Sequence, residues 1–381
     1  MDDIKGLSLF ANVGIAEAYF ADIGVDICLA NELDEKRAKF YREVYPNTEM
    51  VCGDITDEAI RDSLVDKAIA NGVNFIIATP PCQGMSVAGN RDPDDVRNQL
   101  IFYAIDVIKR VSPLFVLLEN VPRQLKTQIR IKGRRSYIPD YVKAELEEYY
   151  YFNDETLVKA KDYGVPQIRE RNVFLLTRKR LGFVWGFPAR HKKIITLEDA
   201  IGDLPPLDPE LREGVVLTNK MFPDFGEKKA IGALVSCWHR PPIHPWRHVK
   251  WMMHTPTGQS AIFNGKYFPQ KDDGTRIIAH HNHYRRLSWD QPCRTITKFN
   301  NYISTLSSVH PGREVLLNGR KIFSDPRVLS VYELLIVMSL PLDWRIPAWA
   351  SDCFVRTVIG EGIPSRLSRD IMLRLLQQLG K

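Results

Sequence analysis

The sequence lacks the usual features of secreted and membrane proteins. Its six cysteines are scattered and form no CxxC pair, so they indicate no disulfide framework. The first residues, MDDIKGLSLF, contain no basic segment followed by an apolar one, and no apolar run approaches the roughly 18 residues of a membrane span. We therefore expect a protein of the reducing cytoplasm, without a signal peptide or a membrane partner.

The sequence also lacks a strong excess of either charge, and it shows no internal repeat or low-complexity tract. The net charge is +6 and the pI about 8.9, a mildly basic balance that permits a nucleic-acid partner without requiring one. Hydrophobic residues make up 44% and charged residues 26%, which excludes disorder of the whole chain. A length of 381 residues suits one large domain with a smaller one, or two medium domains.

Short apolar runs alternate with helical patterns up to about residue 180. This alternation is typical of an α/β domain with a mostly parallel sheet and helices on both faces, as in Rossmann-like folds. The helix expected at 57–71 has Thr56 as its candidate N-cap. The predicted strands are 7–11, 27–31, 75–79, 114–118 and 172–177, and the predicted helices are 14–23, 34–44, 57–71 and 100–111.

The pattern changes after about residue 185, where Pro, Gly, His and Trp become frequent and helical periodicity fades. Helical patterns return at 330–340 and 368–379. We therefore expect a smaller, irregular domain at 186–325, inserted into a catalytic domain formed by 1–185 plus 326–381.

A cysteine follows the predicted strand 75–79 and two prolines. Ligands of open α/β sheets bind at the carboxyl ends of the strands, where Cys82 falls. The prolines stiffen the approach, and the polar stretch 84–98 has the length of a functional lid. A buried structural thiol is the simpler alternative for a lone cysteine. The prolines and the lid favour a nucleophile.

Two further polar motifs adjoin predicted strands. Glu119 directly follows the apolar run 114–118, where a carboxyl group in a partly apolar site can have a raised pKa and donate a proton; capping of the next helix is the alternative. Gln167, Arg169 and Arg171 alternate onto one face before the strand 172–177. Two arginines on one face can hold a phosphate or a carbonyl oxygen, although a solvated face is common for such patterns.

Together, these motifs resemble those of the DNA (cytosine-5) methyltransferase family, of the bacterial restriction–modification type. The ordered set is Pro81-Cys82-Gln83, Glu119-Asn120-Val121 and Gln167-x-Arg169-x-Arg171. Blocks at 327–341 and 358–364 also match, although Glu361 stands where the family usually has Asn. The resemblance implies that 186–325 is a target recognition domain, and that the enzyme acts as a monomer on double-stranded DNA.

The resemblance implies S-adenosylmethionine as cofactor, S-adenosylhomocysteine as product, and no metal. The family's cofactor loop, F-x-G-x-G-G, corresponds to residues 10–15, with Asn12 and Ile15 in place of two glycines; Asn tolerates the left-handed conformation that a glycine would supply. Glu32 is expected on the ribose, Asp54 on the adenine amino group and Phe10 on the adenine ring. The full expected cofactor set is Phe10, Ala11, Asn12, Gly14, Glu32, Leu33, Asp54, Ile55, Pro80, Leu100, Gly362 and Ile363.

The resemblance also implies the chemistry. The Cys82 thiolate would attack carbon 6 of a flipped cytosine, with Gln83 beside it in the catalytic set. Glu119 would contact N3 and the exocyclic amine, Arg171 would hold O2, and Arg169 would support the site. DNA contacts are expected from Ser86, Asn120, Gln167, Arg285 and Arg286. A cognate restriction endonuclease would act on the same site without binding the enzyme.

Several alternatives stay open. The basic segment 123–135 contacts phosphate or is a solvated loop. Cys237, His239, His244 and His248 could bind zinc, although their spacing matches no standard finger. An RNA cytosine methyltransferase is the nearest rival: the dedicated RNA family has a Thr-Cys motif where this chain has Glu119 and Asn120, but a tRNA-acting member of the DNA-type family remains possible. A catalytically silent DNA-binding protein is disfavoured by the intact motifs.

Overall fold

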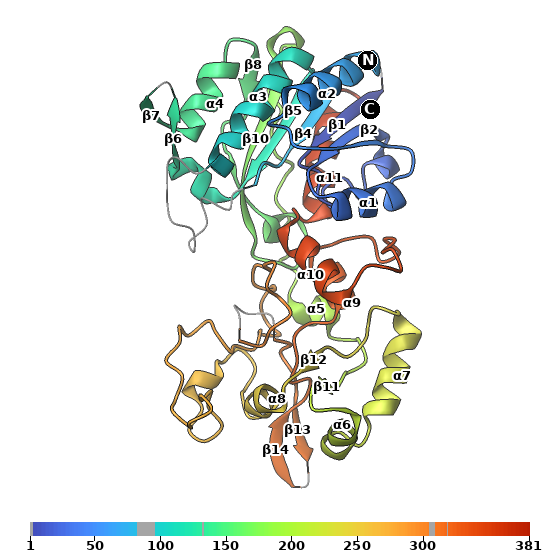
Figure 1. Cartoon of the computed structure of the whole chain (residues 1–381), viewed down its shortest axis with the longest axis vertical. Coiled ribbons are helices and arrows are strands. Elements are labelled where there is room, and N and C mark those ends of the chain that lie inside the picture. Colours follow the sequence, from blue (N-terminus) through green and yellow to red (C-terminus); the bar gives the residue numbers. More distant parts are fainter. Residues whose placement is uncertain (1–2, 82–95, 132, 305–308, 318) are drawn as a thin grey trace.

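The computed structural model describes residues 3–81, 96–131, 133–304, 309–317 and 319–381. Within these ranges, no helix is long and apolar enough to span a membrane. The chain is elongated, with a large sheet at one end and a loop-rich part at the other (Figure 1).

An eight-stranded sheet forms the core of the larger part, in the order β3-β2-β1-β4-β5-β10-β8, with β9 also paired to β10. The strands from β3 to β5 are parallel, whereas β10 is antiparallel to β5, β8 and β9. This confirms the predicted α/β fold with a mostly parallel sheet. The strands are β1 Ile4–Leu9, β2 Val25–Glu32, β3 Glu49–Cys52, β4 Phe75–Ala78, β5 Phe115–Asn120, β8 Tyr150–Phe152, β9 Leu157–Lys159 and β10 Glu170–Arg178.

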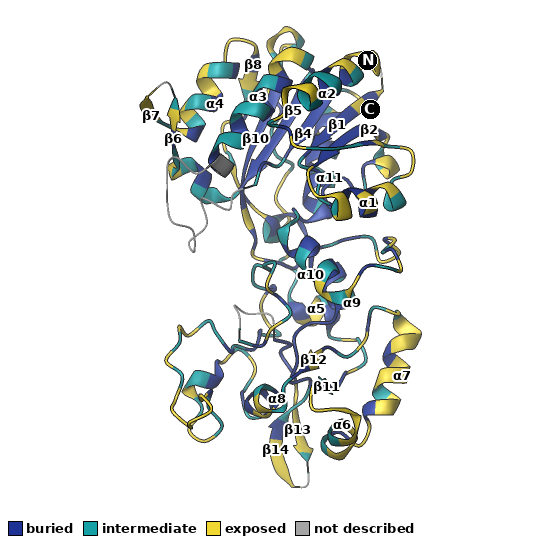
Figure 2. Cartoon of the chain, viewed as in Figure 1, coloured by how far each residue is buried: buried dark blue, intermediate teal, exposed yellow. Residues whose placement is uncertain are grey.

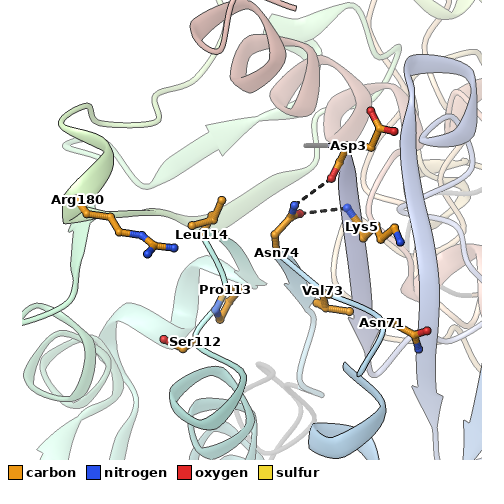
Figure 3. Close-up of a pocket in the computed structure, with 10 residues that line it drawn as sticks. Asp3, Lys5, Asn71, Val73, Asn74, Ser112, Pro113, Leu114 and Arg180 are labelled. Atoms are coloured by element: carbon orange, nitrogen blue, oxygen red, sulfur yellow. Dashed lines mark hydrogen bonds between the residues drawn. The ribbon is translucent and has the colours of Figure 1, made fainter. Parts of the chain in front are cut away.

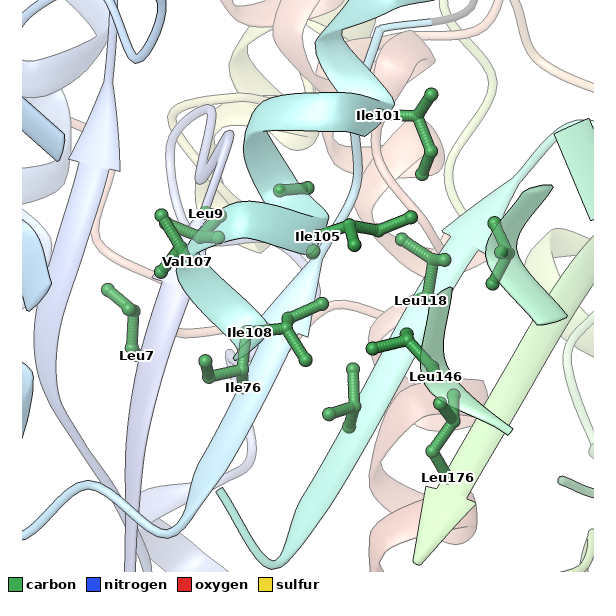
Figure 4. Packing of buried hydrophobic residues seen from close by; sticks show 14 of the residues in the cluster. Leu7, Leu9, Ile76, Ile101, Ile105, Val107, Ile108, Leu118, Leu146 and Leu176 are labelled. Atoms are coloured by element: carbon green, nitrogen blue, oxygen red, sulfur yellow. The ribbon is translucent and has the colours of Figure 1, made fainter. Parts of the chain in front are cut away.

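Period-two alternation along the central strands builds a separate apolar cluster on each face of the sheet. On β4, Ile76 faces one cluster and Ile77 the other, and on β5 Leu118 and Leu117 divide in the same way. The strands appear as fully buried ribbons in Figure 2. The first cluster packs against the apolar face of α3, where Ile105 and its neighbours meet the strands (Figure 4).

Helices cover both faces. Helices α2, α3 and α4 pack on the first cluster, while α11 packs on the second (Figure 1). Asp34 caps α1 through its side chain, and Ser330 forms a capping box with Glu333 at the start of α9. These helices are α1 Glu35–Val44, α2 Glu58–Ala70, α3 Leu100–Val111, α4 Ile138–Leu146, α9 Val331–Val337, α10 Asp352–Glu361 and α11 Ser365–Gln378.

The loop-rich part has its own apolar cluster, which includes Trp251, Met252 and Val309. Small two-stranded sheets and short helices surround it in the lower half of Figure 1. These elements are α5 Leu197–Ile201, β11 Glu210–Leu211, α6 Val215–Met221, α7 Phe225–Val235, β12 Ile243–His244, α8 Trp246–Met253, β13 Glu314–Leu317 and β14 Arg320–Phe323. A further hairpin, β6 Gln128–Ile131 with β7 Arg134–Tyr137, projects from the larger part.

A third cluster joins the two parts. It contains Leu197 and Ile296 from within 186–325, together with Val331 and Val355 from α9 and α10 and Ile15 from the segment after β1. Packing is therefore continuous across the expected domain boundary, and the two parts share side chains there.

Two local predictions are wrong. The segment 14–23 forms turns and a short 3-10 helix, η1 Ala21–Ile23, instead of an α-helix. The carbonyl oxygens of Ile15 and Ala16 accept hydrogen bonds from the hydroxyls of Ser365 and Ser368 on α11, so a tertiary contact replaces the helical ladder. The N-cap of α2 is Asp57, whose Oδ1 accepts from Ala59 N at 2.8 Å, and not Thr56.

Candidate active site

The carboxyl ends of β1, β4 and β5 are tied together by side-chain hydrogen bonds. Thr79 Oγ1, just after β4, donates to Phe10 O at 3.1 Å, and Asn120 Nδ2 at the end of β5 donates to Pro80 O at 3.0 Å. These bonds fix the backbone that leads into the Pro-Cys motif. The candidate nucleophile Cys82, Gln83, Ser86 and residues 84–95 of the expected lid lie outside the described residues.

Glu119 and Arg171 form a nearly buried ion pair at this edge. Arg171 Nε lies 2.6 Å from Glu119 Oε1, and each side chain is 10% exposed. Antiparallel pairing of β5 with β10 brings the two motifs together, because Val173 faces Glu119 and Arg171 lies two residues further along. Burial raises the pKa of Glu119, while the positive charges of Arg171 and Arg169 oppose the rise without cancelling it. The carboxyl group is therefore suited to hold a proton and to return it under control of an adjacent cation.

Arg169 and Gln167 are buried and bind backbone instead of facing solvent. Arg169 Nη1 donates to Ile296 O at 2.7 Å, and Nη2 donates to the carbonyl oxygens of Gly360 at 3.1 Å and Glu361 at 3.3 Å. Gln167 Nε2 donates to Val337 O, and its Oε1 accepts from Ile296 N. The side chains of residues 167, 169 and 171 thus face the protein interior, where Arg169 links the start of β10 to Ile296 and to the end of α10.

The loop expected to hold the cofactor turns without the two missing glycines. Phe10, Asn12 and Gly14 have positive φ values of 58°, 51° and 80°. Asn12 therefore adopts the left-handed conformation predicted for it, and its Nδ2 donates to Val358 O at 3.2 Å. Ile15 is buried against Gly362, where an added Cβ would lie 2.8 Å from Ile15 Cγ2. Each replacement is accommodated by a contact with α10 or the turn that follows it.

Two acidic groups follow the neighbouring strands β2 and β3. Glu32, at the end of β2, accepts from Asn12 N at 2.8 Å through Oε2 and from Asp34 N at 3.0 Å through Oε1, so its carboxylate is fixed in orientation. Asp54 is exposed, and Asn31 holds its loop by donating to Gly53 O at 3.1 Å. Leu33 is 65% exposed beside Glu32. Oriented carboxylates beside an exposed apolar side chain at this edge fit a ligand with hydroxyls, an amine and an aromatic ring.

Other members of the expected cofactor set differ in exposure. Pro80, Ile55 and Ile363 are buried, whereas Leu100 and Gly362 are partly exposed. Only main-chain groups or edges of the buried members can face a ligand. Ala11 is also buried, and its N–H donates to Asn31 O at 2.9 Å.

Three of the residues expected to contact DNA are buried in the structure. Arg286 is fully buried, and its guanidinium donates to the carbonyl oxygens of Met252, His310, Phe323 and Asp325. Asn120 and Gln167 are also buried, and both functional ends of each amide hydrogen-bond within the protein. These polar groups hydrogen-bond within the protein, and their contact with DNA stays a prediction. Arg285 is partly exposed, and its DNA contact stays a prediction.

The histidine-rich segment has structural hydrogen bonds. His239 bonds Ser330 and Pro205 O through its two ring nitrogens, and His244 Nε2 accepts from Val328 N at 3.2 Å. Burial lowers the pKa of His244 to about 3, so the ring is a neutral acceptor. No group of three or more His, Cys, Asp or Glu side chains placed to hold a metal occurs in the described ranges.

Sequence reasoning missed the polar pairs that stiffen the site from behind. Asn172 on β10 donates through Nδ2 to Gln124 Oε1 at 2.8 Å, and both side chains are fully buried. For Thr79, the sequence likewise predicts a place in a strand but not the hydrogen bond to Phe10 O. A polar residue within an apolar strand is the available signal, because burial forces it to find a partner.

An open pocket of about 610 Å³ lies at the opposite edge of the sheet (Figure 3). Lys5 is the second residue of β1, and Asn74 and Leu114 precede β4 and β5. Asn74 is occupied by its bonds to Lys5 N and Asp3 O. These are the amino ends of the strands, so the pocket is separate from the edge that carries Glu119 and Glu32.

Comparison with known proteins agrees with this arrangement. The profile of the C-5 cytosine-specific DNA methylase family matches residues 4–377. The chain is 40% identical over 381 residues to the type II methyltransferase M1.HgaI of Avibacterium volantium, covering 99% of each protein. A solved prophage chain of E. coli, described as a DNA modification methyltransferase, has a TM-score of 0.68 at 22% identity and 99% coverage of this chain and 100% of that one. S. pombe Dnmt2 methyltransferase has a TM-score of 0.56 at 15% identity, covering 99% of each chain, and both structures show a shared fold. The chain belongs to the C-5 cytosine-specific DNA methylase family and is an enzyme of the DNA cytosine-5 methyltransferase class.

Proposed function

We propose that this enzyme methylates carbon 5 of a cytosine within a specific duplex DNA sequence, using S-adenosylmethionine, and that it protects DNA in a type II restriction–modification system. Family membership supports the reaction, and the type II methyltransferase that is 40% identical along the whole chain supports the biological setting. A cognate endonuclease would act on the same DNA sequence and need not bind this protein.

The observation that carries the mechanism is the Glu119–Arg171 pair at 2.6 Å. In the proposed reaction, Cys82 adds to carbon 6 of a flipped cytosine, and the ring electrons move toward N3 and carbon 5. Glu119, whose pKa is raised by burial, supplies a proton at N3 as the sulfur–carbon bond forms. Arg171 would stabilise the carboxylate that results and hold the O2 oxygen of the base. Carbon 5 then accepts the methyl group. Loss of the carbon-5 proton to solvent re-forms the double bond between carbons 5 and 6 and expels Cys82, and the N3 proton returns to Glu119.

Glu32, Asp54 and the loop 10–15 are the residues that would hold the cofactor. Glu32 would accept hydrogen bonds from the ribose hydroxyls, and Asp54 would accept one from the adenine amine. Phe10 and Leu33 would cover the adenine ring. When bound, S-adenosylmethionine supplies an electrophilic methyl group. The oriented carboxylate of Glu32 and the exposed side chains of Asp54 and Leu33 support this assignment. Replacing Glu32 by Ala should weaken binding by on the order of 1–3 kcal/mol in calorimetry.

We also propose that residues 186–325 select the DNA target. Their loops carry partly exposed cations such as Arg285 and Arg294. Exchange of this segment with that of a relative of known target should transfer the target sequence, as read by bisulfite sequencing in a methylation-free host. Methylation of the original sequence by the chimera would refute the assignment.

Trapping with 5-fluorocytosine tests the reaction. Fluorine cannot leave carbon 5 as a proton does, so DNA with this base at the target should remain covalently bound after methyl transfer. The adduct should survive denaturing electrophoresis and require S-adenosylmethionine for full yield. Cys82→Ala should abolish it, whereas Cys237→Ala, which removes an exposed thiol elsewhere, should not.

A second pair of variants tests the acid. Glu119→Gln should slow adduct formation strongly while DNA binding persists, because the amide cannot supply the proton. Glu170→Gln is the matched control, since Glu170 is the exposed neighbour of Arg171 on the same strand. An adduct formed by the Cys82→Ala protein would show that another group is the nucleophile.

A further inference from the structure

Two oppositely charged side chains from distant parts of the chain meet beside the proposed cofactor loop. Arg37 Nη2 lies 2.7 Å from Glu361 Oε2, and the two side chains are 26% and 23% exposed. Arg37 belongs to the first turn of α1, and Glu361 is the last residue of α10. A partly sheltered pair of this kind keeps more of its Coulomb energy than a pair on open surface.

Glu32 is hydrogen-bonded to the two segments that carry this ion pair. Arg37 N donates to Asp34 Oδ1 at 2.9 Å, and Asp34 N donates to Glu32 Oε1, so Arg37 rises from the turn that orients Glu32. On the other side, Asn12 links Glu32 to α10: its N–H donates to Glu32 Oε2, and its Nδ2 donates to Val358 O, one turn before Glu361. Glu32 thus lies between the element that carries the cation and the element that carries its present partner.

Glu32 is the alternative partner for Arg37. Burial raises the pKa of Glu32, and the positive charge of Arg37 already acts against that rise. The long arginine side chain is flexible, so a guanidinium released from Glu361 can turn toward this carboxylate and form charge-assisted hydrogen bonds with it. Those bonds would compete with ligand hydroxyls for the same oxygens.

We propose that Glu361 is a positioning residue that holds Arg37 away from Glu32 and so keeps the Glu32 carboxylate available to the ribose of S-adenosylmethionine. This inference rests on the cofactor role proposed for Glu32. The family's usual Asn at this position carries no charge and could not neutralise Arg37. Glu361 and Arg37 therefore act as a matched pair in this chain.

The sequestering role predicts an asymmetric response in calorimetric titration with S-adenosylmethionine and with S-adenosylhomocysteine. Glu361→Gln should raise the Kd for both ligands on the order of 5- to 10-fold, because the freed Arg37 occupies Glu32. Arg37→Met should leave the Kd close to that of the wild type. The double variant Arg37→Met/Glu361→Gln should bind nearly as well as the wild type, since the competing cation is gone.

If the ion pair only stabilised the local fold, the pattern would differ. Arg37→Met and Glu361→Gln would then raise the Kd equally, and the double variant would bind no better than either single variant. In steady-state assays, Glu361→Gln should raise KM for the cofactor with kcat nearly unchanged. Asp62→Asn, which breaks the 2.7 Å pair of Asp62 with Arg110 between α2 and α3, is the matched control and should not change the Kd.

The outcomes separate the inference from the function on which it rests. If the wild type binds the cofactor and Glu32→Ala weakens binding, but Glu361→Gln binds as the wild type does, only the sequestering role is overturned. A double variant as weak as Glu361→Gln also overturns it. Unchanged binding by Glu32→Ala would instead overturn the proposed cofactor site.

Discussion

Glu17 offers a quantitative test of the packing next to the loop 10–15, which is proposed to hold the cofactor. Its side chain is 4% exposed, and Tyr41 Oη donates to Glu17 Oε1 at 3.2 Å. Burial raises the pKa of this carboxyl to about 7 from the ordinary value of 4.5, although hydrogen bonds from Ser8 and Tyr41 act in the opposite direction. We therefore predict that Glu17→Gln, which mimics the protonated group, stabilises the protein at alkaline pH.

The magnitude follows from the difference between the two pKa values. A rise from 4.5 to about 7 corresponds to about 3 kcal/mol, at about 1.36 kcal/mol per pH unit. Because the folded pKa is the higher one, the folded state binds the proton more tightly. The stabilisation is complete below pH 4.5 and is lost as the pH rises to about 7. Glutamine cannot ionise, so the variant avoids that loss.

Urea unfolding followed by circular dichroism, from about pH 5 to about pH 8.5, measures the effect. The free energy of unfolding of Glu17→Gln relative to the wild type should grow with pH and reach up to about 3 kcal/mol above pH 7. Glu148→Gln, at an exposed position, should show no such growth. A constant difference between Glu17→Gln and the wild type across this range would refute the raised pKa.

Three further predictions concern the polar contacts of the site and the recognition segment. Asn120→Ala should lower the single-turnover methylation rate by on the order of 10-fold, with cofactor affinity unchanged, because Pro80 O loses its donor; an unchanged rate would contradict this role. Arg286→Met should lower the free energy of unfolding by on the order of 3 kcal/mol and leave the salt dependence of DNA binding unchanged, because Arg286 is buried, whereas Arg285→Met should reduce the salt slope by about one; the opposite pattern would show that Arg286 contacts DNA. Gly362→Ala should weaken cofactor binding and cost roughly 1–3 kcal/mol of stability, because its Cβ meets Ile15, and Ile15→Ala in the same protein should recover part of both; no recovery would show that the two sites are not coupled by packing.

The elements with strong local signals were predictable from sequence. Helix α3 has the predicted bounds because its apolar residues recur on one face of the helix. The bounds of β4 and β5 differ from those of the predicted strands by no more than two residues, because each apolar run is short and has polar or turn-forming residues at both ends. Local periodicity carries this information. The proximity of Glu119 to Arg171 depends in addition on the antiparallel direction of β10, which places the start of β10 at the edge where β5 ends.

Long-range contacts explain what the sequence did not reveal. The segment 14–23 has a helical pattern, but hydroxyls on α11 take its carbonyl oxygens, and Phe20 packs in a different cluster from Ile15. Arginine side chains are usually exposed, whereas Arg286 is fully buried. Its burial depends on carbonyl oxygens contributed by residues up to 39 positions away. Neither outcome has a signal within a local window.

The turn at 360–362 lies at the contacts of two departures from the family pattern, Ile15 and Glu361. Gly360 leaves no room for a Cβ, which would lie 2.3 Å from Thr297 O, and its own carbonyl oxygen accepts from Arg169. Glu361 pairs with Arg37, and Gly362, which has no Cβ, leaves room for Ile15. One turn therefore contacts residue 297 of the proposed recognition segment, Arg169 before β10, and the loop proposed to hold the cofactor. Each of the two replacements, Ile15 and Glu361, has its contact at this turn, so a further change at 360–362 should disturb both.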